Sequence, residues 1–329
     1  MTNFVKYAVD NGGILRPLYV PAELTGGLGL MNPSIYNDNG QLMTTLRNVN
    51  YTFYHSEGKK YPHQFGSIAY VHPEDDLRLK TINYYLELSD DLEVLRYDKI
   101  DMKDVETHEP LWQFWGLEDV RLVRWDNKLY ISGVRRDTTP NGQGRIELSE
   151  IIIGDYYVPA VSRFRIPLPN GADSYCEKNW MPITDMPYHF VKWTNPTEVV
   201  KVNPDTKTCD VAFIGKGVNL KLEQRGSSQV IPYGDNYLGI THESNLFKDE
   251  LGHKDATYRH RFIVWDKQWN IIQYSSEFDF MTEHVGFCAG LCRKGDNLYI
   301  SFAFQDNVAF VLRVPEKAVD TYITITNQM

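Results

Sequence analysis

The sequence has few cysteines and no long apolar run. Its 329 residues include 4 Cys, and the two that lie closest, Cys288 and Cys292, match neither a usual zinc pair nor a disulfide framework. We therefore expect Cys176, Cys209, Cys288 and Cys292 to be reduced and structural. No stretch approaches the roughly eighteen apolar residues of a membrane span, and residues 1–6 lack the pattern of a secretory leader. For a complete chain, these features predict a cytoplasmic protein.

Basic residues are also in the minority. The chain has 34 Lys and Arg against 43 Asp and Glu, and its formal net charge is −9. A protein that holds nucleic acid on a broad basic face has the opposite balance, so we expect no such partner. A local cationic pocket remains compatible with this composition.

The chain lacks both linkers and long helical patterns. No Ser/Gly-rich, Pro-rich or low-complexity tract interrupts it, which favours a single domain over residues 1–329. Amphipathic helical periodicity is scarce, whereas aromatic residues are abundant, with 21 Tyr, 15 Phe and 7 Trp. This composition predicts an all-β fold with little helix.

A recurrent pattern is present instead. Five times, a short polar or glycine-bearing cluster precedes a tight-turn signal and then a strand rich in aromatic and β-branched residues. The clusters occupy residues 32–35, 118–121, 177–180, 225–228 and 286–290. The strands after three of the turns, at 129–132, 237–240 and 298–301, have nearly the same sequence.

Near-copies of this kind indicate a radial repeat. In a β-propeller each blade has four strands, and the innermost strand runs along the central axis. We therefore predict a five-bladed β-propeller in which the clusters begin the inner strands. An axial polar pocket would then form where the clusters converge, around Asn32, Asp119, Lys178, Ser227 and Gly290.

The second cluster has the most informative chemistry. On a regular strand the adjacent Glu118 and Asp119 point to opposite faces, and Arg121 shares the face of Asp119. A carboxylate beside an arginine is often a structural ion pair. Alternatively, a carboxyl group aimed at a bound sugar could donate a proton to a departing glycosidic oxygen. The place of Asp119 in the axial series favours the second interpretation.

Basic residues in or just after the clusters suggest an anion site. Arginine guanidinium groups, which can make paired hydrogen bonds, and a lysine ammonium group close together can bind phosphate. The same residues could instead be solvated surface charges. Trp180 beside Lys178 favours an enclosed position for that lysine. The candidates for phosphate are Arg47, Arg135, Arg136 and Lys178.

The histidines do not indicate a metal site. His242, His253, His260 and His284 match no compact metal motif, so we expect no metal. His242 follows one of the repeat strands and could instead contact a sugar hydroxyl.

Residues 116–121, Gly-Leu-Glu-Asp-Val-Arg, resemble the Gly-x-Glu-Asp-Pro-Arg signature of glycoside hydrolase family 130, five-bladed propellers that include β-mannoside phosphorylases. Further landmarks occur in the family's order and span most of the chain. They are Asn32-Pro33, Arg47, Lys178 before Met181-Pro182, residues 238–242, and residues 304–306.

The resemblance implies a role for each matched residue. Asp119 would be the general acid, acting directly or through a sugar hydroxyl, and phosphate would bind to the four basic candidates. No cofactor would be needed beyond phosphate or a sugar phosphate as co-substrate. The sugar itself would contact Asn32, Glu118, Arg121, Arg225, His242, Glu283 and Asp306.

The implied activity is an inverting transfer of a glycosyl unit, with mannosyl as the candidate, to or from phosphate, a sugar phosphate or a nucleotide sugar. Val120 replaces the proline of the motif, and residues 225–229 and 258–262 look closer to a divergent branch found with glycosyltransferases. Two alternatives remain. One is a glycoside hydrolase with a second carboxylate that activates water, and the other is a non-catalytic, sugar-binding propeller that scaffolds glycan synthesis.

Overall fold

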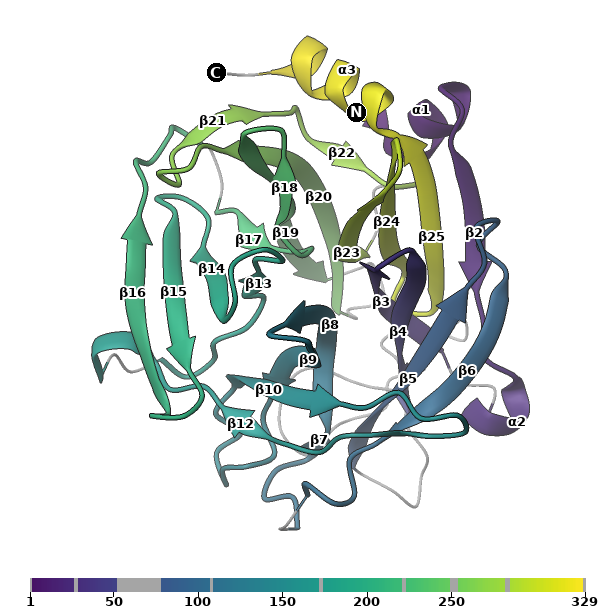
Figure 1. Cartoon of the computed structure of the whole chain (residues 1–329), viewed down its shortest axis with the longest axis vertical. Coiled ribbons are helices and arrows are strands. Elements are labelled where there is room, and N and C mark those ends of the chain that lie inside the picture. Colours follow the sequence, from purple (N-terminus) through teal and green to yellow (C-terminus); the bar gives the residue numbers. More distant parts are fainter. Residues whose placement is uncertain are drawn as a thin grey trace.

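The computed structural model describes residues 2–26, 29–51, 78–106, 109–171, 174–220, 223–248, 254–281 and 285–327. The strands of these residues form five sheets arranged around a common centre (Figure 1). Helix in the described ranges is limited to α1 (Phe4–Asp10), α2 (Ala22–Thr25), α3 (Glu316–Thr326) and the 3-10 turn Pro169–Gly171. The predicted all-β class is confirmed, and the arrangement of the sheets is propeller-like.

The sheets follow one another along the chain. The first contains β3 (Leu30–Asp38), β4 (Gln41–Val49), β5 (Leu79–Leu88) and β6 (Val94–Asp101), with β7 (Phe114–Trp115) and β11 (Val158–Pro159) at its edges. The second contains β8 (Leu117–Trp125), β9 (Lys128–Arg135), β10 (Arg145–Ile151) and β12 (Phe164–Arg165). The third contains β13 (Met181–Pro182), β14 (His189–Trp193), β15 (Glu198–Asn203) and β16 (Thr208–Ile214).

The last two sheets include strands from the N-terminal part of the chain. The fourth contains β1 (Thr2–Asn3), β17 (Arg225–Gly226), β18 (Ile231–Tyr233), β19 (Asn236–Lys248), β20 (Lys254–Trp265), β21 (Ile271–Tyr274) and β22 (Phe278–Asp279). The fifth contains β2 (Ile14–Leu18), β23 (Gly286–Lys294), β24 (Asn297–Phe304) and β25 (Val308–Pro315). Because β1 pairs with β22 and β2 pairs with β25, both ends of the chain meet at these sheets (Figure 1).

Each of the five predicted turns occurs between two strands of one sheet. Asn39 and Gly40 connect β3 to β4, and Asp126 and Asn127 connect β8 to β9. All four residues have positive φ, between 49° and 99°, which Asn, Asp and Gly tolerate best. The turns between β13 and β14, β18 and β19, and β23 and β24 also lie where the sequence predicts them.

A buried glutamine connects the innermost strands. Gln229 lies between β17 and β18, and its Nε2 donates to the carbonyl oxygens of Ile35 at 3.0 Å and Leu122 at 2.9 Å. Its Oε1 accepts from the backbone nitrogen of Leu291 at 2.9 Å. One fully buried side chain therefore joins the first, second and fifth sheets to the fourth.

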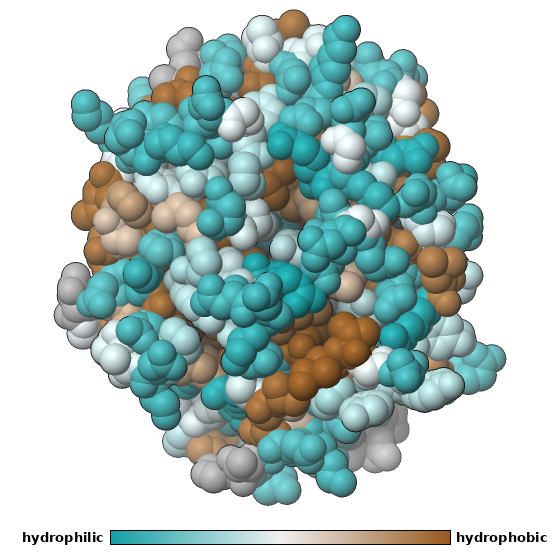
Figure 2. Space-filling view, in the orientation of Figure 1, coloured by the Kyte–Doolittle hydropathy of each residue, from teal (hydrophilic) through white to brown (hydrophobic). Residues whose placement is uncertain are grey.

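Apolar side chains fill the spaces between neighbouring sheets. The interface of the second and third sheets, for example, contains Trp125, Trp180 and Phe190, all nearly fully buried. The face shown in Figure 2 is mostly hydrophilic, with a hydrophobic patch over the end of β10. Burial of aromatic surface between sheets is the main source of stability in such an arrangement.

The four cysteines are free thiols, as the sequence predicts. Among the residues described, no helix combines the length and apolar character needed to span a membrane. The same residues contain no group of three or more His, Cys, Asp or Glu arranged to hold a metal ion.

Candidate functional site

The inner strands of the first two sheets are bulged at equivalent points. The pairing of β3 with β4 shifts between Met31 and Ser34, and that of β8 with β9 shifts between Glu118 and Arg121. Within these bulges Asn32 has a φ of 48° and Asp119 a φ of 52°. Asn32 and Asp119 therefore occupy matching positions in the two sheets. A bulge also changes the direction in which nearby side chains point.

The bulge brings Glu118 and Asp119 to the same cation. Arg47 NH1 lies 2.7 Å from Asp119 Oδ1, and Arg47 NH2 lies 3.4 Å from Glu118 Oε2. The prediction that these carboxylates point to opposite faces is therefore wrong, because the two-residue alternation of a regular strand is interrupted here. We refer to Glu118 and Asp119 as the carboxylate pair.

Arg47 is held on all sides by protein groups. In addition to its ion pairs, Nε donates to Thr81 Oγ1 at 3.2 Å, and NH2 donates to the Tyr51 hydroxyl at 2.6 Å. Burial opposes the charge of Arg47, but Tyr51 and the carboxylate pair outweigh this effect and raise its pKa. Every nitrogen of the guanidinium has a partner. Arg47 therefore positions the carboxylate pair and has no pair of nitrogens left to bind phosphate.

The two carboxyl groups have opposite pKa shifts. Burial raises the pKa of Glu118, and its single long contact with Arg47 does not reverse the rise. Burial also acts to raise the pKa of Asp119, but Arg47 and a 2.7 Å hydrogen bond from Asn32 Nδ2 more than compensate and lower it. Asp119 is therefore ionised, while Glu118 keeps its proton to higher pH.

Two further cations act on the carboxylate pair. The charges of Arg136 and Lys178 both favour ionisation of Glu118, and Lys178 also contributes to the lowered pKa of Asp119. The Lys178 side chain is exposed, so the enclosed position expected for it is wrong. No carboxylate among the described residues forms an ion pair with Lys178, which leaves its charge available to a ligand.

Arg135 does not join this group. It forms ion pairs with Glu106 at 2.8 Å, Asp137 at 3.3 Å and Glu147 at 3.0 Å, in a separate cavity. Arg135 and Arg136 are consecutive at the end of β9, and only Arg136 acts on Glu118. The expected phosphate contact by Arg135 does not fit this arrangement, because three carboxylates already neutralise its charge.

The fourth sheet contributes a buried histidine. His242, on β19, has Nδ1 2.8 Å from Ser227 Oγ, and its ring stacks on Tyr258 with centroids 5.3 Å apart. Burial, together with the nearby His260 and Lys178, lowers the pKa of His242 well below its usual value, so the ring is neutral at pH 7. Arg225 adds to the positive field on His242, although its Nε also pairs with Glu223 at 2.7 Å.

Arg121 connects the second and fourth sheets. Its Nε donates to the Ser227 carbonyl at 2.6 Å, and NH1 donates to the Asp119 carbonyl at 2.9 Å. Burial lowers the pKa of Arg121 to about 10, against the opposing effect of the Asp119 charge. Its NH2 is buried without a hydrogen-bond partner in the described structure, as is Oδ1 of Asn32. Both atoms lie beside Asp119 and could be satisfied by a polar ligand.

The fifth sheet reaches the same region. Asp306, in the turn after β24, has a φ of 48° and contributes to the raised pKa of both Arg47 and Tyr258. Gly290 lies on β23 where a Cβ atom would be 2.3 Å from the Ile35 nitrogen, so only glycine allows the inner strands to approach. The predicted sugar-binding residue Glu283 lies outside the described residues.

Most of the predicted site residues are therefore brought together. Three residues of the site were not selected from the sequence: Tyr51, Thr81 and Tyr258. Tyr258 lies in segment 258–262, whose only signal is its resemblance to the divergent branch, and nothing in the pattern around Tyr51 or Thr81 distinguishes them from ordinary strand residues.

No family model matches the sequence, and no curated protein matches it. Solved structures share its fold over most of the chain. One is the β-1,2-mannobiose phosphorylase from Listeria innocua in complex with β-1,2-mannobiose. The alignment covers 91% of this chain and 92% of the phosphorylase chain, at a TM-score of 0.55 and 10% identity. A structure reported for the GH130 family of mannoside phosphorylases aligns over 87% of this chain and 84% of its own, at a TM-score of 0.55 and 10% identity. The chain has a GH130-like fold.

A putative glycoside hydrolase from Parabacteroides distasonis is similar to the same extent, with a TM-score of 0.57, 10% identity and 87% of each chain covered. The GH130 family of the second structure also contains glycoside hydrolases that target β-1,2 mannosidic linkages in Candida mannan. At these identities the likeness shows a GH130-like fold and does not show the chemistry.

Proposed function

We propose that this protein is a five-bladed propeller enzyme that transfers a glycosyl unit, mannosyl in the first instance, between a sugar hydroxyl and phosphate with inversion. The observation that carries the proposal is the carboxylate pair held by Arg47, with Lys178 and Arg136 near enough for their charges to favour ionisation of Glu118. One carboxylate with an opposing anion site is the minimum that an inverting phosphorylase needs, because phosphate itself is the nucleophile.

Asp119 is the acid/base in this proposal. In the synthetic direction the acceptor hydroxyl attacks the anomeric carbon of a sugar phosphate, its proton passes to the Asp119 carboxylate, and phosphate leaves with the electrons of the broken C–O bond. Phosphorolysis is the reverse, and protonated Asp119 then returns the proton to the departing glycosidic oxygen. The lowered pKa of Asp119 suits the synthetic direction, because the resting carboxylate is ready to accept a proton.

The phosphate site would consist of Lys178 and Arg136, with Arg225 nearby. Lys178 is exposed and has no ion-pair partner in the described structure. Arg136 donates to the Tyr175 hydroxyl at 3.1 Å and to the Gly142 carbonyl at 3.0 Å, and no carboxylate among the described residues forms an ion pair with it. Arg47 and Arg135 are excluded from direct phosphate contact because their nitrogens are occupied by other residues. His242, neutral and buried, would bind a hydroxyl of the sugar or an oxygen of the phosphate.

The carboxylate pair fits phosphorolysis better than hydrolysis. An inverting hydrolase has two carboxyl groups roughly 6.5–9.5 Å apart on opposite sides of the sugar, so that one activates water. Here Glu118 and Asp119 share one guanidinium and come from consecutive residues. Hydrolysis is the second candidate, because Glu118 does supply a second carboxyl group with a raised pKa.

A donor and acceptor screen tests the proposal. The protein would be incubated with β-1,2-mannobiose and inorganic phosphate, with mannose and mannose 1-phosphate, and with nucleotide sugars, and the products would be separated by chromatography. We expect phosphate-dependent formation of mannose 1-phosphate. Release of mannose without phosphate would show a hydrolase, transfer only from nucleotide sugars would show a glycosyltransferase, and sugar binding without any turnover would show a binding module.

A further inference from the structure

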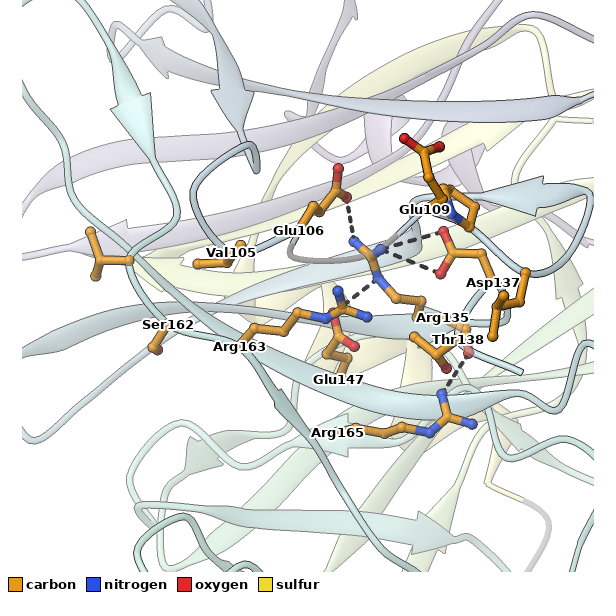
Figure 3. Close-up of a pocket in the computed structure, with 13 residues that line it drawn as sticks. Val105, Glu106, Glu109, Arg135, Asp137, Thr138, Glu147, Ser162, Arg163 and Arg165 are labelled. Atoms are coloured by element: carbon orange, nitrogen blue, oxygen red, sulfur yellow. Dashed lines mark hydrogen bonds and ion pairs between the residues drawn. The ribbon is translucent and has the colours of Figure 1, made fainter. Parts of the chain in front are cut away.

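A second cavity, of about 520 Å³, lies beside the end of β9. It is lined by Arg135 from β9, Glu147 from β10 and Arg165 from β12, together with residues before β7 and before β12 (Figure 3). Its volume is in the range of small-molecule sites. The described residues that line it include neither member of the carboxylate pair nor Lys178, so this cavity is separate from the site described above.

A buried ionic network forms one side of the cavity. Figure 3 shows Arg135 with Glu106, Asp137 and Glu147 around its guanidinium. Arg135 is 3% exposed, and its three acidic partners neutralise its charge. Arg135 therefore has a structural role in the wall of the cavity. Neighbouring residues are the ones that face a ligand.

Glu147 has an unused oxygen in this cavity. The residue is fully buried, and its Oε1 forms ion pairs with Arg135 Nε at 3.0 Å and Arg163 Nε at 2.9 Å, although neither contact has hydrogen-bond geometry. Its Oε2 has no hydrogen-bond partner in the described structure, and neither has the buried Oγ1 of Thr138, which lines the same cavity. Unsatisfied buried polar atoms are costly, so the Glu147 carboxylate and Thr138 Oγ1 together indicate an occupant that hydrogen-bonds to both.

The charges around the cavity indicate a neutral occupant. Four carboxylates face three guanidinium groups, in the set Glu106, Glu109, Asp137, Glu147, Arg135, Arg163 and Arg165. An anion would meet the free oxygen of Glu147, and a cation would meet Arg163 and Arg165. A hydroxyl group can donate to a carboxylate and accept from a guanidinium at the same time.

We propose that this cavity binds a neutral polyhydroxylated molecule, a sugar ring or a polyol, whose hydroxyls donate to Glu147 Oε2 and accept from the terminal nitrogens of Arg163. Thr138 Oγ1 takes a further hydroxyl. Apolar side chains on the lining, Pro110, Leu111 and Val161, provide contact for the C–H face of the ring.

The cavity is connected to the region of the carboxylate pair through one residue. Asp137, which pairs with Arg135, also accepts a hydrogen bond from the Gly116 nitrogen at 2.8 Å through Oδ2. Gly116 lies two positions before Glu118. The binding proposed here does not depend on turnover at Asp119, so the two proposals can fail separately.

Titration of the Asp119→Asn variant with D-mannose, D-glucose and myo-inositol, followed by NMR, tests the proposal. We expect at least one of these probes to bind, and Arg163→Gln and Thr138→Val to weaken that binding about tenfold each. Arg163 is partly exposed and Thr138→Val preserves shape, so both variants should fold, which circular dichroism would check. Arg16→Gln, at an exposed position of β2, is the control and should leave binding unchanged.

Three outcomes would overturn the proposal. The first is that none of the probes binds. The second is binding that Arg163→Gln and Thr138→Val leave unchanged, because the sugar would then occupy another site. The third is binding of inorganic phosphate that depends on Arg163 and exceeds that of every sugar, because the cavity would then be an anion site.

Discussion

Arg47 NH1 lies 2.7 Å from Asp119 Oδ1, and the same guanidinium lies 3.4 Å from Glu118. One arginine from the first sheet thus holds two consecutive carboxylates from the second sheet, but with unequal contacts. Asp119 receives a second hydrogen bond from Asn32 at 2.7 Å, whereas Glu118 has only the longer contact. This inequality gives the neighbouring carboxyl groups pKa shifts of opposite sign, so that Asp119 is the ionised member of the pair.

Asp119→Asn should lower turnover by about a hundredfold or more, the usual contribution of a positioned acid or base. Asparagine keeps the size of the side chain and removes the group that exchanges the proton. Glu118→Gln should have a smaller effect, on the order of tenfold, because it acts through the position of Arg47. Glu87→Gln, at a partly buried carboxylate that pairs with Arg96, is the matched control and should retain full activity. If Glu118→Gln is the inactive variant and Asp119→Asn is not, the two roles are reversed.

The same two variants should have opposite pH-dependent effects on stability. The folded-state pKa of Asp119 is lowered, so its charge stabilises the fold above the unfolded pKa, and this contribution is lost as pH falls through the folded pKa. The folded-state pKa of Glu118 is raised, so ionisation of Glu118 costs stability as pH rises through that value. Relative to the parent protein, Asp119→Asn should therefore lose stability and Glu118→Gln should gain it between acidic and neutral pH. Urea unfolding at several pH values measures both, and parallel profiles would contradict the pKa assignments.

Phosphate at millimolar concentration should raise the melting temperature, because a ligand that binds only the folded state stabilises it. Lys178→Met should abolish this rise and Arg136→Gln should reduce it, since the charges of these two residues act on Glu118 and would attract an anion bound beside it. Lys201→Met, at an exposed lysine of the third sheet, should preserve the rise. An unchanged phosphate response in Lys178→Met would place the anion elsewhere.

Gln229→Ala should be among the most destabilising single substitutions. It would leave the Ile35 and Leu122 carbonyl oxygens and the Leu291 nitrogen without their partner at the centre of the molecule. Each unsatisfied buried group costs about 1–3 kcal/mol, so a loss of roughly 3 kcal/mol or more in the free energy of unfolding is expected. Gln268→Ala, at an exposed turn residue, should change stability by less than about 0.5 kcal/mol. A loss as small as that of the control would show that Gln229 does not hold the sheets together.

The sequence predicted the strand and turn order well, because repeated clusters and Asn, Asp and Gly turn residues are local signals. It predicted the direction of side chains less well. A regular strand predicts opposite faces for Glu118 and Asp119, and the bulge at Asp119 leaves no mark that a single sequence shows clearly.

At two further places the structure differs from the prediction between neighbouring residues. Asn179, and not Lys178, has the left-handed conformation found at Asn32 and Asp119, with a φ of 63°. Arg135 and Arg136 were predicted to act together, but neighbouring residues at a strand end alternate in direction. Spacing along the chain identifies the cluster, whereas the local backbone decides which member faces the ligand.

The anomeric configuration of the sugar phosphate tests the central claim most directly. Incubation of the protein with β-1,2-mannobiose and inorganic phosphate, followed by NMR, distinguishes the two possible anomers of mannose 1-phosphate, which do not interconvert because the phosphate blocks ring opening. An inverting displacement at the β-linkage predicts α-mannose 1-phosphate, formed only when phosphate is present and lost in Asp119→Asn. Formation of the β-anomer, or release of free mannose at the same rate without phosphate, would contradict the account.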